Sequence, residues 1–361
     1  MRADTRTMRI LNHPERFGRL DPGGMLERVK ALPGQCLEGW CRGLEWKVPS
    51  AWGQACGLVV LGMGGSAIGA DLMQGWLGDA LPRPIFVNRT YTIPRWAGRG
   101  SLVLACSYSG NTEETLAGAA EARRRGARIL ALTSGGKLAE WARRHGYPLL
   151  LIPTGLPPRS AVGYMTFAPL GMLARLGWVA GRRLPVEAAC RGLEAFIERR
   201  IGPEVRVSAN PAKRVAETLH GRLPVLYGAA GDWEGITYRW RTQIEENAKC
   251  LTFHHIFPES THNEISAWLN PREVARRSAA VFLIDPAVHP RTLRRMEFTR
   301  RIVRSQGARA LMVGVSGATV QERMLKMIAL GDFASVYLAF LYKVDPTPVV
   351  RVEALKKFLK R

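Results

Sequence analysis

Short, wholly apolar runs alternate with longer helical patterns along this chain, and that alternation limits its possible folds more than any other feature. The runs in the first half lie at 57–61, 84–87, 102–106, 129–133 and 149–153. Strands that are apolar at every position are buried on both faces, as in a parallel sheet covered by helices on each side. The pattern therefore predicts an α/β fold with a doubly wound parallel sheet.

The same alternation begins again in the second half, after a helical region at 185–219. The strands expected there are 223–227, 279–284 and 308–315. They follow the order of the first-half strands at 57–61, 102–106 and 127–134, with a glycine turn and a helix after the first strand of each set. An internal repeat of this kind predicts two doubly wound units of the same architecture.

The length of 361 residues is enough for two domains of ordinary size. The pattern predicts an N-terminal helical segment at 1–47, a first α/β domain at 48–184, a second at 185–343 and a C-terminal tail helix at 344–361. Within the N-terminal segment, Pro33-Gly34 is expected to divide the helical run into two short helices.

The composition is typical of a soluble globular protein, with 47% hydrophobic and 23% charged residues. No apolar run approaches the ~18 residues needed to span a membrane. The first twenty residues are Arg-rich and lack an apolar signal core, so we expect a cytoplasmic protein. The six cysteines are scattered without paired spacing, which favours reduced thiols and indicates neither a disulfide framework nor a zinc site.

The formal net charge is +22, with a sequence pI of about 10.5. The excess is mostly arginine, and it is dispersed over helical stretches such as 121–125 and 294–301 rather than gathered in a tail. We therefore expect solvated basic surfaces and no specific nucleic-acid site. The positive field would still attract an anionic substrate.

A hydroxyl-rich turn at 107–112 follows the strand at 102–106 and precedes a helix. Ser107, Ser109 and Thr112 lie where free N–H groups and the positive end of a helix dipole meet, which favours binding of a phosphate monoester. The alternative is an ordinary helix cap, in which Ser109 or Thr112 bonds the N–H groups ahead of Glu113 and Glu114.

A glycine turn at 62–66 follows the first strand, and Gly65 and Ser66 there suit a close backbone approach to a ligand. Its spacing does not match the GxGxxG pattern of dinucleotide loops, so no nicotinamide cofactor is expected. Close packing of the helix on the strand is the alternative. The second repeat has Ala229-Ala230-Gly231 at this turn and 285–289 at the other, so phosphate chemistry is expected only in the first repeat.

Five sequence blocks carry a family resemblance. GMGGSAIGAD (62–71) and CSYSGNTEET (106–115) resemble the sugar isomerase (SIS) fold. With PPRSAVGYM (157–165), IEENAK (244–249), ESTHNEISAW (259–268) and also VDPTPV (344–349), the chain resembles the bifunctional phosphoglucose/phosphomannose isomerase family from about residue 57 onward. Thr261 and Ala70 depart from the family pattern.

The resemblance implies an aldose–ketose isomerase without metal or cofactor, acting on hexose 6-phosphates as a homodimer with its site near the interface. It implies interconversion of glucose 6-phosphate and fructose 6-phosphate, and of mannose 6-phosphate and fructose 6-phosphate, through a cis-enediol. The rival hypothesis is a non-catalytic SIS-domain sensor that binds phosphosugars. A sensor would leave the candidate catalytic residues without a role.

Such an isomerase needs a base, an acid for ring opening and a cation that stabilises the enediolate. The resemblance assigns the base to Glu246, ring opening to His262, the cation to Arg159 and closure over the sugar to Lys356, with Lys357 as a competitor. The simpler alternatives are a helix-end role for Glu246 and a surface position for Arg159. His254 and His255 are expected in a partly buried strand, and Glu264 is expected to orient His262 or tie down its turn.

Overall fold

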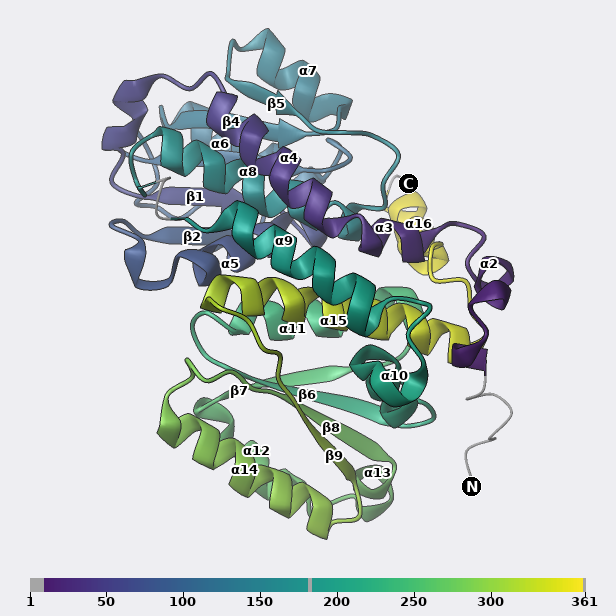
Figure 1. Ribbon diagram of the computed structural model, residues 1–361. Helices are drawn as coiled ribbons and strands as arrows, with labels where there is room; N and C mark the ends of the chain where they lie inside the picture. Colours follow the sequence, from purple (N-terminus) through teal and green to yellow (C-terminus); the bar gives the residue numbers. More distant parts are fainter. Residues whose placement is uncertain (1–9, 181–183, 360–361) are drawn as a thin grey trace. The chain divides into compact units, whose positions relative to one another are not determined.

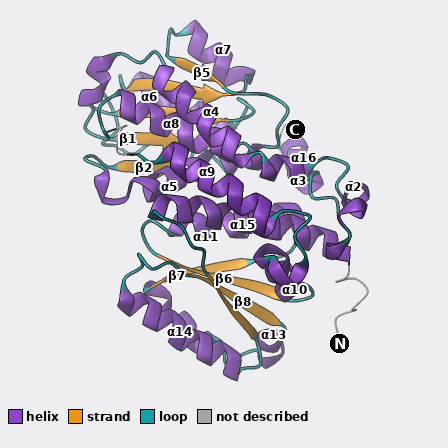
Figure 2. Cartoon of the chain, viewed as in Figure 1, coloured by secondary structure: helices purple, strands orange, loops and turns teal. Residues whose placement is uncertain are grey.

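The computed structural model describes residues 10–180 and 184–359, so the outermost parts of the predicted N-terminal segment and tail lie outside the described residues. The chain divides into two compact units: the first unit is Ala31–Arg191, and the second unit combines Met1–Lys30 with Gly192–Arg361. Each unit contains one parallel sheet and its own helices (Figure 1; Figure 2). The predicted α/β class is confirmed. The four-part division by residue ranges stays a prediction.

The sheet of the first unit has the strand order β2-β1-β3-β4-β5, and every neighbouring pair is parallel. Its strands match the five predicted runs to within two residues: β1 (Leu58–Leu61), β2 (Ile85–Asn88), β3 (Leu102–Ser107), β4 (Arg128–Thr133) and β5 (Leu149–Leu151). β3 is buried along its whole length, as its continuous apolar run predicts.

The helices of the first unit are α4 (Leu32–Glu45), α5 (Gly65–Leu77), α6 (Glu113–Arg124), α7 (Gly136–Arg144) and α8 (Val162–Arg175), with short turns η3 (Ser50–Gln54), η4 (Gly78–Ala80) and η5 (Pro158–Ser160). Alternate strand residues such as Val59, Val103 and Ile129 form a core cluster with Ala119 of α6 and Leu138 of α7. This packing covers one face of the sheet and is the period-2 pattern expected of strands.

The predicted break at Pro33-Gly34 is wrong. The helical run is divided at Ala31, where α3 (Met25–Lys30) has ended, and Pro33 lies in the first turn of α4. A proline is tolerated there because the first N–H groups of a helix have no intrahelical acceptor.

The sheet of the second unit has the order β7-β6-β8-β9 and is also wholly parallel. Its strands are β6 (Leu223–Ala229), β7 (Phe253–Phe257), β8 (Ser278–Leu283) and β9 (Arg309–Val313). The order corresponds strand by strand to β2-β1-β3-β4, which confirms the internal repeat. His254 and His255 are partly buried in the edge strand β7, as expected.

The second unit also holds most of the helices: α2 (Phe17–Leu20), α3, α10 (Pro211–Leu219), α11 (Glu234–Ala248), α12 (Glu264–Ala267), α13 (Arg272–Arg276), α14 (Pro290–Ser305), α15 (Val320–Tyr342) and α16 (Val350–Phe358). The sequence boundary of the two units falls within α9 (Val186–Phe196), which continues into the π-helix η7 (Ile197–Ile201). Short turns complete it: η1 (Ile10–Asn12), η2 (Pro14–Arg16), η8 (Val207–Ala209) and η9 (Glu259–His262). Figure 1 shows α11 and α15 on one face of the sheet and α14 on the other.

The expectation that no apolar run approaches the length of a membrane span needs correction. Helix α15 is long and apolar enough to cross a membrane, with a mean hydropathy of 1.6 over its best window. However, 94% of that window is buried inside the structure. A helix that is apolar all round and enclosed by protein is typical of a core helix.

Candidate active site

The hydroxyl-rich turn joins β3 to α6. Ser107 Oγ and Thr112 Oγ1 lie 2.8 Å apart and share a hydrogen bond. Thr112 occupies the N-cap position of α6, but its side chain makes no capping bond. The ordinary-cap alternative is therefore wrong for Thr112, whereas Ser109 Oγ does accept the Asn111 N–H at 3.3 Å. The first N–H groups of α6 and its positive dipole end face this turn.

The loop after β4 is hydrogen-bonded to the hydroxyl-rich turn and packs closely against it. Ser134 donates both its N–H and its hydroxyl to the Tyr108 carbonyl, at 3.0 and 2.7 Å. Gly110 has φ +68°, and a Cβ there would lie 1.8 Å from the Gly135 carbonyl oxygen. Only glycine fits such a close approach at a positive φ, so the packing of this turn against the loop after β4 requires Gly110.

The glycine turn is bonded directly to the hydroxyl turn. Ser66 is buried, and its Oγ accepts the Tyr108 N–H at 3.0 Å. A serine hydroxyl that accepts one bond still carries a proton to donate. A Cβ on Gly65 would lie 2.7 Å from Pro158 O and 3.0 Å from Arg159 N. The start of α5, the hydroxyl turn and η5 thus meet at one place in the first unit.

Arg159 lies in η5 and is buried, with 3% of its surface exposed, so the surface-arginine alternative is wrong. The loop that leads to it is held by Tyr108, whose hydroxyl donates to Pro153 O at 2.9 Å and accepts the Leu156 N–H at 2.8 Å. Sequence reasoning missed Tyr108. The available signal was an aromatic residue in the middle of an otherwise small, polar turn.

Glu246 lies in the last turn of α11 and is partly buried. Lys249 follows at φ +54° and donates from Nζ to the carbonyls of Glu246, at 2.8 Å, and Pro346, at 3.0 Å. It thereby caps α11 and fastens it to the segment that precedes α16. Lys356 and Lys357 are both exposed on α16, so burial does not distinguish between them.

Glu246 and His262 lie at opposite ends of the sheet in the second unit. Helix α11 returns from the carboxyl end of β6 to the amino end of the parallel strand β7, and Glu246 lies in its last turn. His262 is exposed in η9, beyond the carboxyl end of β7. Five strand residues span about 16 Å. The two predicted catalytic groups are therefore not brought together within this unit.

Glu264 is bonded to the sheet rather than to His262. Its Oε1 accepts the Tyr227 hydroxyl of β6 and the Trp268 Nε1–H, the latter at 2.8 Å. Burial, together with the Glu264 carboxylate, raises the pKa of Tyr227 well above its ordinary value, because both disfavour a phenolate. These contacts agree with the expectation that Glu264 ties down its turn rather than orients His262.

In the second unit, the turn after β8 is the counterpart of the hydroxyl turn after β3, and a carboxylate occupies it. Asp285 is buried, and its two oxygens accept from Arg323 Nε at 2.5 Å and a terminal guanidinium nitrogen at 3.0 Å. This bidentate pair raises the pKa of Arg323. The two corresponding turns thus differ in their side chains: the turn after β3 carries hydroxyls, and the turn after β8 carries an internal ion pair.

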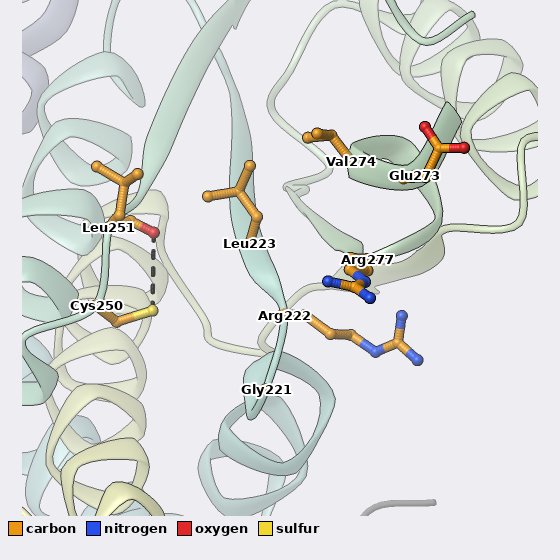
Figure 3. A pocket seen from close by; sticks show the side chains of 8 residues that line it. All are labelled: Gly221, Arg222, Leu223, Cys250, Leu251, Glu273, Val274 and Arg277. Carbon is orange, nitrogen blue, oxygen red and sulfur yellow. Dashed lines mark hydrogen bonds between the residues drawn. The ribbon is translucent and has the colours of Figure 1, made fainter. Parts of the chain in front are cut away.

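A cavity of about 370 Å³ lies at the amino end of the second-unit sheet, next to Cys250 and Leu251, which precede β7. Figure 3 shows Arg222 and Arg277 beside each other there, with the apolar side chains of Leu223, Leu251 and Val274. No predicted site residue lines this cavity. Within the described ranges 10–180 and 184–359, no three His, Cys, Asp or Glu side chains form a group that could hold a metal ion.

Comparisons with known proteins agree with a fold of two parallel-sheet units. Residues 54–147 match the family model of the SIS domain, and residues 208–359 match that of the bacterial phospho-glucose isomerase C-terminal SIS domain. A hypothetical protein from Thermus thermophilus shares the fold, with a TM-score of 0.72 at 18% identity over 99% of this chain and 95% of that one. The fold and the hydroxyl turn thus define an SIS-domain protein.

Two curated relatives specify the family. A bifunctional phosphoglucose/phosphomannose isomerase from Caldicellulosiruptor bescii is 38% identical over 93% of this chain and 98% of its own length. Another from Aquifex aeolicus is 33% identical over 90% and 97%, respectively. The chain belongs to the bifunctional phosphoglucose/phosphomannose isomerase family, and it is an isomerase. The predicted resemblance is confirmed.

Proposed function

We propose that this protein interconverts glucose 6-phosphate and fructose 6-phosphate, and mannose 6-phosphate and fructose 6-phosphate, through a cis-enediol. The observation that carries the proposal is the meeting of a hydroxyl-rich turn and a buried arginine at the start of α5. Hydroxyl and backbone N–H donors bind a phosphate, and a buried guanidinium stabilises an enediolate oxygen. The family relatives carry the same two activities in their names.

The phosphate is proposed to bind the hydroxyls of Ser107, Ser109 and Thr112, together with the N–H of Gly65 and the hydroxyl of Ser66. The shared bond between Ser107 and Thr112 orients these two hydroxyls before the substrate arrives. Preorganised donors lose little freedom on binding. Binding of the phosphate is therefore proposed to position carbons 1 and 2 of the sugar.

Glu246 is proposed to remove the proton from carbon 2 of the open-chain aldose and to return it to carbon 1, while the proton of the O2 hydroxyl moves to O1. The electron pair of the broken C–H bond forms the enediolate, whose oxygens Arg159 stabilises. His262 is proposed to move the proton that opens the ring, and Lys356 to close over the sugar. For mannose 6-phosphate the same base must reach the opposite face of carbon 2. All the groups assigned to binding and catalysis belong to the chain itself, so we expect full activity in the presence of a chelator.

The site is proposed to be shared between two copies in a cytoplasmic homodimer. Support comes from the separation of Glu246 and His262 at the two ends of one sheet. A histidine from the partner copy would supply the ring-opening group without any change in the fold of either chain. The Glu246 and the His262 of one active site would then belong to different chains.

A coupled assay with both hexose 6-phosphates tests the proposal on wild type, Glu246→Gln and Glu245→Gln. Glu246→Gln should lower kcat by about 10²–10⁴-fold, because it removes the base and keeps the shape of the side chain. Glu245→Gln is the matched control from the same turn and should keep most activity. A non-catalytic sensor would bind sugar phosphate with no turnover in wild type. Unchanged turnover in Glu246→Gln would remove Glu246 as the base.

A further inference from the structure

A second cavity, of about 450 Å³, lies beyond the carboxyl end of β9 in the second unit. Its walls come from the end of α9 and η7, the first turn of α10, the loop after β9 and the first turns of α15. We call it the cationic cavity, and its charged lining residues are Arg199, Arg200, Arg214, Glu322 and Lys326. Four cationic side chains thus face a single carboxylate.

The one carboxylate in this lining already has its partners. Glu322 accepts the Ala318 N–H at 2.8 Å and pairs with Lys326. These contacts and the neighbouring Arg323 lower the pKa of Glu322, although burial opposes them. Glu322 therefore serves the local structure of α15 and neutralises Lys326. Within the described residues, no carboxylate pairs with Arg199, Arg200 or Arg214.

Lys326 is a nearly buried charge in the lining of the cationic cavity. It is only 9% exposed, and its Nζ donates to the Ser316 carbonyl at 2.9 Å. The same ammonium lies 5.7 Å from the centre of the Phe196 ring. A lysine held by a carboxylate, a carbonyl and an aromatic face has lost its usual rotamer freedom. Its position is set before any ligand arrives.

The backbone around the cationic cavity is shaped by two unusual local features. A Cβ on Gly192 would lie 2.4 Å from Glu322 Oε1, so glycine lets α9 pass next to this carboxylate without displacing the Glu322 side chain. The π-helix Ile197–Ile201 then carries Arg199 and Arg200. Single π turns are rare and occur often at functional sites. Both features bring α9 and η7 to the cavity.

We propose that the cationic cavity binds a small organic polyanion of the phosphate-ester or polyphosphate class. Arg199, Arg200 and Arg214 are exposed residues of this lining, so their guanidiniums are accessible to a dissolved anion, and a multiply charged anion is attracted to several of them at once. The planar fork of an arginine matches phosphate oxygens in pairs. The volume exceeds that of a bare phosphate and lies within the range of small-molecule sites.

This cavity is separate from His262 and Glu246, the predicted acid and base of its own unit. It opens beyond β9, whereas His262 follows β7, and these strands form opposite edges of the sheet. Three strand spacings separate the two edges by about 14 Å. Glu246 lies at the other end of the strands. The proposal therefore goes beyond the isomerase activity and does not depend on it.

Calorimetric titration of the full chain with pyrophosphate tests the proposal. Arg200→Gln/Arg214→Gln should weaken binding by about tenfold or more, because charged hydrogen bonds are lost. The control Arg294→Gln/Arg304→Gln removes two exposed arginines of α14 with the same charge change, and it should weaken binding by no more than about twofold. Equal weakening in both double variants would overturn the proposal in favour of a general positive field.

Two further titrations, one with a variant and one with another anion, identify the binding site and the ligand class. Ser107→Ala alters the hydroxyl turn of the first unit and should leave pyrophosphate binding to the cationic cavity intact. Loss of pyrophosphate binding in Ser107→Ala would show that pyrophosphate binds in the first unit, and would overturn the proposal. Citrate should bind more weakly than pyrophosphate, and equal binding would overturn the phosphate class. Absence of saturable pyrophosphate binding to wild type would overturn the cationic cavity as a site, whatever the isomerase assay shows.

Discussion

Arg239 and Asp332 form an ion pair of 2.7 Å inside the contact between α11 and α15, with side chains only 2% and 3% exposed. Asp332 also accepts from Gln243 Nε2 at 3.0 Å, and Asn247 Nδ2 donates to Ser335 Oγ at 2.8 Å. Positions 239, 243 and 247 are successive turns on one face of α11. We expect this buried polar ladder to set the register of α11 along α15, and therefore the position of Glu246.

Removing one partner of this ion pair should be costly. We expect Arg239→Met to lower the free energy of unfolding by about 3–5 kcal/mol, because Asp332 is left as a buried charge. The double variant Arg239→Met/Asp332→Leu should recover most of that loss, since no charge remains unpaired. Urea unfolding of the three proteins measures both effects. Additive losses in the double variant would contradict the coupling.

The activity of the double variant gives a separate test of register. If the ladder positions Glu246, the stable double variant should show kcat lowered by about tenfold to a hundredfold, with KM changed much less. Unchanged kcat in the folded double variant would mean that apolar packing alone, such as Trp240 against Gly331, sets the register.

A shared active site predicts complementation between two inactive proteins. Glu246→Gln and His262→Ala should each be nearly inactive alone. When they are mixed, unfolded and refolded together, heterodimers should regain one intact site that combines Glu246 of one chain with His262 of the other. The control mixes the double variant Glu246→Gln/His262→Ala with wild type, whose heterodimers contain no intact site. Absence of regained activity despite mixed dimers would refute the shared site.

The close approach of α5 and η5 predicts a specific effect of one methyl group. Gly65→Ala places a Cβ 2.7 Å from Pro158 O, so η5 and Arg159 must shift. We expect kcat/KM to fall by about tenfold to a hundredfold while the chain stays folded. Gly34→Ala in α4 is the control, since nothing lies within 4 Å of its Cβ. It should stabilise the protein by about 0.5–1 kcal/mol and keep full activity.

His254 predicts a dependence of stability on pH. Burial, together with the charges of Arg241 and His255, lowers the pKa of His254 from 6.5 to about 4. Below pH 6.5 the unfolded chain therefore takes up a proton before the folded chain does, and stability falls as the pH decreases toward 4. His254→Phe keeps a ring against Tyr238 and cannot titrate.

The contribution of His254 should be about 1–2 kcal/mol after allowance for its partial exposure. Unfolding midpoints measured between about pH 4.5 and 7.5 should therefore fall less steeply in His254→Phe than in wild type. Parallel curves for the two proteins would show that His254 titrates normally in the folded state.

Most strands were predictable because they are continuous apolar runs, and the repeat indicated which strands of the two halves correspond. The edge strand β7 is not such a run, because His254 and His255 lie within it. The hydroxyl turn was predictable because its residues are adjacent in sequence. Arg239 and Asp332 lie 93 residues apart, and no local pattern indicates that two charges so far apart will be buried together. The position of Pro33 was mispredicted because a proline ends a helix in the interior and is accepted in the first turn. The bonds of Tyr108 to Pro153 and Leu156 likewise depend on long-range packing.

The Asp285–Arg323 pair has a consequence for how the two repeats respond to the surrounding solution. A carboxylate that belongs to the chain cannot diffuse away, so its effective concentration at Arg323 exceeds that of any dissolved phosphate. The turn after β8 is therefore always occupied by a group of the chain itself, whereas the turn after β3, as the proposed phosphate site, would fill and empty with the supply of its ligand. Of these two corresponding turns, only the one after β3 is proposed to respond to the level of a phosphate ester.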